Sequence, residues 1–167
     1  MTDLNDLYTL LEYHRWANLR VLEALQPLSS EEFTRTLLSS FPSIRDTVVH
    51  LYRGDLIWQG RVTDDLERKI PDPNDFPMLE DVRAAWVPVL DGWSAALEGK
   101  TPDSSIVYAT SSGQAQNTRL EDVVRQTVNH ASYHRGQIAT LLRMLEHKMV
   151  ATDYILWVRD KAIPRAS

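Results

Sequence analysis

The stretch from Thr118 to Leu145, TRLEDVVRQTVNHASYHRGQIATLLRML, carries the clearest structural pattern in this chain. Uncharged side chains recur in it every three or four residues, which predicts a helix of about seven turns with one buried face. Thr118 and Glu121 stand three residues apart at its start, and we expect them to form a capping box. The buried stripe consists of Leu120, Val124, Thr127, Ala131, His134, Ile138, Leu141 and Leu145.

Three other segments show the same helical periodicity, over about residues 3–25, 43–61 and 78–98. Ser43 is placed to cap the second of them. That segment is apolar on most of its sides, which is typical of a helix in the interior of a bundle. We therefore expect an all-α four-helix bundle, formed by a single domain over residues 1–167.

The connections between these helices differ in character. Residues 31–40 can hold a helical turn or two, and residues 62–77, with three prolines and four aspartates, predict a long loop. Residues 105–110 have strand character and 114–117 can return as a weak second strand, so we expect a small β-hairpin between the third and fourth helices. A short C-terminal helix is expected from Tyr154 to about Lys161.

Composition excludes several classes of function. The chain has 18 Lys and Arg against 23 Asp and Glu, a net charge of −5, which argues against a nucleic-acid partner. It has no cysteine, which excludes disulfides, thiolate metal sites and a cysteine nucleophile. No apolar run reaches the ~18 residues of a membrane span, and the acidic N-terminal stretch does not resemble a signal peptide. We expect a cytoplasmic protein with no membrane partner.

Histidines are the strongest candidates for chemistry. His130 and His134 are four residues apart, so on a helix both project from one face, where two imidazoles can bind one metal ion. His50 lies on the stripe of the second helix, and Gly54, one turn later, leaves room beside it. Three histidines with an open position are typical of catalytic metal centres. The alternative is that each is a core histidine hydrogen-bonded to its neighbours. Ala131 stands where a zinc protease carries its glutamate, which excludes that chemistry.

Other polar residues on the helix stripes are candidates for supporting roles. His14 and Asn18 lie one turn apart and could orient the metal ligands, or form a buried polar pair that ties helices together. Gln137 is a candidate for the same orienting role. His147 is expected to be solvated at the end of the fourth helix, where a cation favours the helix dipole.

The sequence resembles the DinB family of damage-inducible, YfiT-like bundle proteins. The resemblance spans nearly the whole chain and rests on residues 13–18 (YHRWAN), on Val49-His50-Leu51, and above all on Asn129-His130 with residues 134–138 (HRGQI). It implies a four-helix bundle with a divalent metal, such as nickel, zinc or iron, held by His50, His130 and His134. Relatives of this kind often form homodimers and include thiol-dependent transferases.

We therefore expect a metal-dependent thiol S-transferase that uses a low-molecular-weight thiol and a small electrophile. The metal would stabilise the thiolate, the nucleophilic form of the co-substrate. Two alternatives stay open at this point: a metal-dependent hydrolase, and a non-catalytic, stress-related metal-binding module. Three imidazoles suit Zn, Ni, Cu and Fe alike, so the residues do not identify the metal.

Overall fold

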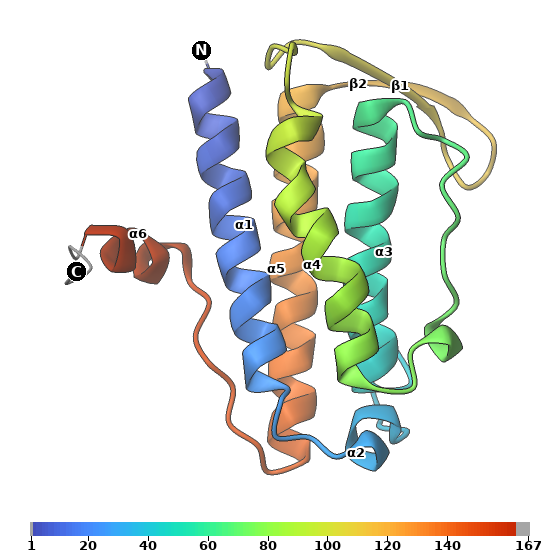
Figure 1. Cartoon of the computed structure of the whole chain (residues 1–167), viewed down its shortest axis with the longest axis vertical. Helices are drawn as coiled ribbons and strands as arrows, with labels where there is room; N and C mark the ends of the chain where they lie inside the picture. Colours follow the sequence, from blue (N-terminus) through green and yellow to red (C-terminus); the bar gives the residue numbers. More distant parts are fainter. Residues whose placement is uncertain (1, 163–167) are drawn as a thin grey trace.

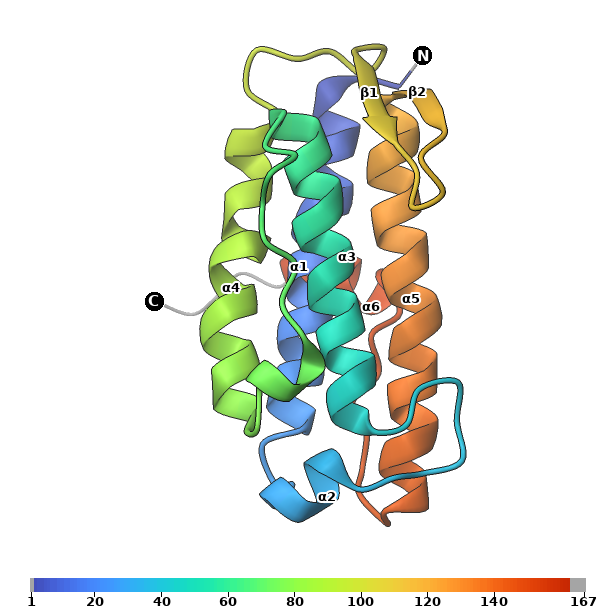
Figure 2. The same cartoon turned by 90° about the vertical axis from the view of Figure 1, so that its right-hand side faces the viewer.

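The computed structural model describes residues 2–162 and shows an all-α bundle of four long helices (Figures 1 and 2). These are α1 (Leu4–Ala24), α3 (Ile44–Thr63), α4 (Leu79–Ala96) and α5 (Leu120–Met144). Around the bundle, α1 packs against α5, α5 against α3, α3 against α4, and α4 against α1. The predicted four-helix bundle is confirmed.

The predicted loop between α3 and α4, here called the crossover segment (residues 64–78), returns the chain along the length of the bundle (Figure 1). It contains one 3-10 turn, η1 (Pro73–Asp75), and brings the start of α4 back beside the start of α3. As a result α3 and α4 run in the same direction, and α1 and α5 run in the opposite one. This route sets which faces of the four helices meet.

The core of the bundle is built from the apolar stripes of all four helices. Two tryptophans of α4, Trp86 and Trp93, are at most 1% exposed and fill the interior between α1 and α3. Burying an aromatic side chain of this size removes about 150–250 Å² from water, which dominates the energetics of a small core. α4 continues through Pro88, which lies inside the helix.

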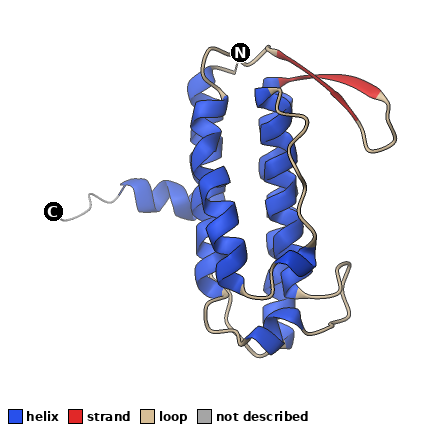
Figure 3. Cartoon of the chain, turned by 45° about the vertical axis from the view of Figure 1, so that its right-hand side comes forward, coloured by secondary structure: helices blue, strands red, loops and turns tan. Residues whose placement is uncertain are grey.

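A two-stranded antiparallel hairpin connects α4 to α5, as predicted (Figure 3). Its strands are β1 (Ser105–Ala109) and β2 (Ala115–Arg119), so the second strand ends two residues later than expected. The predicted capping box is wrong, because Thr118 lies in β2 and its hydroxyl contacts Tyr108 instead. The first amides of α5 are bonded by backbone carbonyls: Leu120 donates to Ser104 at 2.9 Å and Glu121 to Pro102 at 3.0 Å.

Two short helices lie outside the bundle, both at predicted places. α2 (Ser30–Thr34) begins at a capping box between Ser29 and Glu32. α6 (Tyr154–Ala162) projects sideways from α1 in Figure 1 and buries Trp157 against the bundle. None of the described helices combines the length and apolarity that crossing a membrane requires.

The expectation of a solvated His147 at the end of the fourth helix is wrong, because its side chain pairs with Glu32. Its Nε2 lies 3.0 Å from the carboxylate of Glu32, and both side chains are a quarter exposed. The hydrogen bond to His147 is the largest of the contacts that lower the pKa of Glu32 to about 2. This pair fastens α2 to the end of α5.

Candidate metal centre

The structure brings His50, His130 and His134 together at the seam between α3 and α5, which lie side by side in Figure 2. The Nε2 atom of His130 lies 3.0 Å from Nε2 of His50 and 3.1 Å from Nε2 of His134. His50 comes from the second turn of α3. His130 and His134 lie on consecutive turns of α5 and project from the same face of that helix. Residues 80 positions apart in sequence thus present three ring nitrogens to one point.

These distances suit ligation of a single ion. Nitrogens bound tetrahedrally to a metal at about 2.0–2.1 Å are about 3.3 Å from one another, close to the two separations observed. Hydrogen bonding alone satisfies the cluster poorly. Nε2 of a neutral His130 offers either one proton or one lone pair, yet it faces two other ring nitrogens. A shared cation accepts all three lone pairs at once.

Gln137 forms a hydrogen bond with one of the candidate ligands. Its Oε1 lies 2.7 Å from Nδ1 of His134, and its Nε2 donates to the hydroxyl of Ser40 at 3.2 Å. Because an amide oxygen only accepts, the imidazole proton sits on Nδ1, and the lone pair of Nε2 faces the cluster. A partner of this kind is typical of metal-bound histidine.

Gly54 leaves the space that His130 occupies. A Cβ atom at this position of α3 would stand 3.2 Å from Cε1 and 3.3 Å from Nδ1 of His130. Glycine in the interior of a helix costs about 1 kcal/mol relative to alanine. The missing side chain is therefore explained by the close approach of α5 and not by helix formation.

The environment disfavours the charged form of two of the three imidazoles, His50 and His130. Burial, and then the neighbouring His134 and His130, lower the pKa of His50 to about 4. Burial and His134 also lower the pKa of His130. At neutral pH these imidazoles are therefore in the deprotonated form that binds metals.

Aromatic rings flank the cluster at the surface. The ring of Phe41, from the segment that joins α2 to α3, is 4.5 Å from that of His50 and 5.6 Å from that of His134. Tyr133 packs edge-on against His134 at 5.0 Å and is 65% exposed. His50 and His130 are only partly buried, so the cluster reaches the surface beside these rings.

Within residues 2–162, His14 and Asn18 form no hydrogen bond with the three histidines, although His14 and His130 border one small void. What the structure shows directly is a buried polar pair that ties helices together. Nε2 of His14 donates to Oδ1 of Asp55 at 2.8 Å, and the amide nitrogen of Asn18 lies 3.1 Å from the same Nε2. Asn18 also accepts a hydrogen bond from Arg135 at 3.1 Å. The pair lies deeper in the bundle and joins α1 to α3 and α5.

Asp55 is a polar residue that the sequence interpretation missed. Only 2% exposed, it accepts hydrogen bonds from the indole nitrogens of Trp86 at 2.7 Å and Trp93 at 3.0 Å, in addition to His14. The signal was a carboxylate five residues after His50 and next to the apolar Leu56 and Ile57. With Arg135, it forms the charged part of the interior.

Comparison with known proteins agrees with this architecture. The DinB family model matches residues 1–165. Protein DinB of Bacillus subtilis (strain 168) is 26% identical over 159 residues, which cover 90% of this chain and 92% of that protein. The family match covers both helices that carry the histidine cluster. The chain belongs to the DinB family.

Proposed function

We propose that this protein is a divalent-metal-dependent thiol S-transferase acting on small electrophiles. The observation that supports it is the convergence of three imidazoles at a partly exposed point, with Nδ1 of His134 held by Gln137. A site with three protein ligands leaves a coordination position for a small molecule. Three protein ligands and one open position are typical of catalytic metal sites, whereas structural sites usually have four protein ligands.

His50, His130 and His134 would hold the ion, and Gln137 would keep the ring of His134 in place. A divalent cation bound there would supply Lewis acidity that lowers the pKa of a coordinated thiol. Phe41 and Tyr133 would then position the apolar part of an electrophile and keep bulk water from it. No cysteine exists in this chain, so the sulfur must come from a co-substrate.

The proposal also covers the identity of the metal, the cellular compartment and the oligomeric state. Zinc, nickel and iron are the candidate ions, since imidazole suits all of them. The reaction would take place in the cytoplasm, where low-molecular-weight thiols are kept reduced. We also propose a homodimer, as the family resemblance implies.

The test begins with untagged protein, because a polyhistidine tag binds nickel and zinc itself. Elemental analysis after gel filtration should find about one metal ion per chain. Turnover of monochlorobimane should require both the metal and an added thiol such as glutathione or cysteine. His50→Ala, His130→Ala and His134→Ala should each lose metal and activity together.

His147→Ala is the matched control, since it removes a histidine that pairs with Glu32 far from the cluster. It should keep both metal and activity. Turnover of an activated ester without any thiol would instead identify a hydrolase. A folded wild-type protein that takes up no metal from zinc, nickel or iron salts would refute the metal centre altogether.

A further inference from the structure

A second, separate cavity lies between the end of α3, the crossover segment and the hairpin. Its volume is about 250 Å³. Leu56 and Ile57 of α3 and Ile70 of the crossover segment form an apolar lining, and Arg61 and Arg68 also border it. An apolar floor with a few polar groups is the usual composition of a small-molecule site.

Arg61 is held rigidly at this cavity by two aromatic rings. Its guanidinium carbon lies 4.4 Å from the ring centroid of Trp58 and 4.1 Å from that of Tyr108. Its Nη2 donates to the carbonyl of Ala109 at 3.3 Å. Among the carboxylates in residues 2–162, none forms an ion pair with Arg61. Burial lowers the pKa of the Arg61 guanidinium, which shows that this cation is partly removed from water. A half-buried cation is thus fixed in place without a counter-ion.

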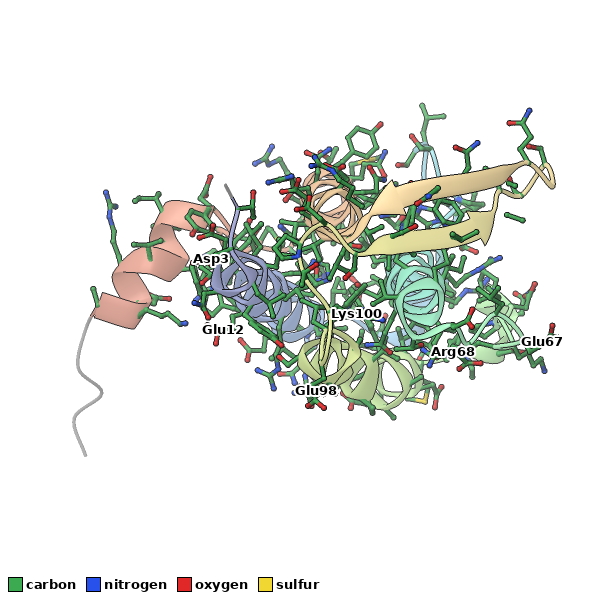
Figure 4. The ribbon with its side chains drawn as sticks, turned by 90° about the horizontal axis from the view of Figure 1, so that it is seen from above. Asp3, Glu12, Glu67, Arg68, Glu98 and Lys100 are labelled. Atoms are coloured by element: carbon green, nitrogen blue, oxygen red, sulfur yellow. The ribbon has the colours of Figure 1, made fainter. Side chains whose placement is uncertain are left out.

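Arg68 borders the same cavity from the crossover segment, beside α3 in the view of Figure 4. It donates through Nε to Asp65 at 2.8 Å and through Nη1 to Gln59 at 3.1 Å. Two arginines and one aspartate, Asp65, are thus the charged residues that border the cavity, in a protein whose overall charge is −5. The local excess of positive charge runs against the charge of the whole chain.

We propose that this cavity binds a small carboxylic acid, with the carboxylate at Arg61 and Arg68 and the hydrocarbon part on the apolar lining. Guanidinium groups form strong, charge-assisted hydrogen bonds with carboxylates. At about 30 Å³ per non-hydrogen atom, the volume accommodates on the order of eight such atoms. A ring or a short alkyl chain bearing one carboxylate meets both requirements.

This site is distinct from the histidine cluster. Arg61 follows His50 by eleven residues on the same face of α3, which places the two about 16 Å apart along the helix. The proposal does not depend on metal binding, and metal-free protein carrying His50→Ala should bind the carboxylate as well as the wild type. A failure here leaves the proposed metal chemistry untouched, and the reverse also holds.

Titration of ¹⁵N-labelled, metal-free protein with benzoate, followed by NMR, tests the proposal. The indole signal of Trp58 and the Nε–H signal of Arg61 should shift saturably, with a dissociation constant on the order of 1 mM for nine non-hydrogen atoms. Benzyl alcohol, which lacks the charge, and acetate, which lacks the ring, should each bind at least about tenfold more weakly. Equal shifts with either compound, or with inorganic phosphate, would overturn the proposal.

Two variants locate the binding groups. Arg61→Gln should raise the dissociation constant for benzoate at least about tenfold, whereas Arg143→Gln, an exposed arginine on α5, should not change it. Leu66, which borders the cavity and is 57% exposed, can be changed without loss of folding. Leu66→Glu should block binding by supplying an internal carboxylate, and Leu66→Gln should not. Benzoate binding that survives both Arg61→Gln and Leu66→Glu would refute the site.

Discussion

Replacing Gly54 by alanine is expected to stabilise the helix and weaken the metal centre at the same time. In a helix interior alanine is favoured over glycine by about 0.8–1.0 kcal/mol. The new methyl group, however, would stand 3.2 Å from Cε1 of His130, and ordinary contact requires about 3.5 Å. The ring must therefore move by about 0.3 Å, which exceeds the roughly 0.2 Å tolerance of metal–ligand distances.

Two measurements separate these effects. Urea unfolding of the metal-free protein should show a change in the free energy of unfolding of at most about 1 kcal/mol, with either sign, as helix propensity offsets the close contact. Competition with a chromophoric chelator should show metal affinity reduced about 10- to 100-fold, as for other changes that disturb ligand orientation.

Gly136→Ala provides the matched control. This glycine also lies in a long helix, α5, but a Cβ atom there meets nothing within 4 Å. The variant should gain up to about 1 kcal/mol of stability and bind metal normally. If Gly54→Ala binds metal as tightly as wild type and Gly136→Ala, then the contact with His130 does not position the ligand and our reasoning is wrong.

Three further predictions address the interior, the pH response and the start of α5. Asp55→Asn should lower the free energy of unfolding by about 3 kcal/mol in chemical denaturation, because the indoles of Trp86 and Trp93 lose a carboxylate acceptor; a loss below about 1 kcal/mol would contradict this. Since the folded state lowers the pKa of His50 from 6.5 to about 4, the unfolded chain binds more protons between these values. Metal-free protein should therefore keep this stability above pH 6.5 and lose it as the pH falls toward 4, and His50→Asn should flatten the slope in pH-dependent denaturation. Thr118→Ala should change stability by less than about 0.5 kcal/mol, since this hydroxyl caps no helix; a loss near 1 kcal/mol, the usual cost of a missing cap, would restore the capping box.

Local patterns in the chain were sufficient to predict the elements of the fold. Helical periodicity located all four long helices, because burial of one face depends only on spacing along the chain. The same rule placed His130 and His134 on one face of α5, four residues apart. Strand character and turn residues located the hairpin to within two residues of its observed end. Each of these features depends on residues within a few turns of one another.

Features that join distant segments depend on the tertiary structure, although the family resemblance had already grouped His50 with His130 and His134. The route of the crossover segment made α3 and α4 parallel and set the partners of Asp55, and no local spacing encodes that route. The hairpin supplied backbone carbonyls to α5 and so replaced the expected Thr118 cap. His50 and His130 are 80 residues apart in sequence, and only the packing of α3 against α5 brings their Nε2 atoms to 3.0 Å from each other. Spacing along the chain determines which face a side chain occupies, whereas its partner depends on how the helices pack.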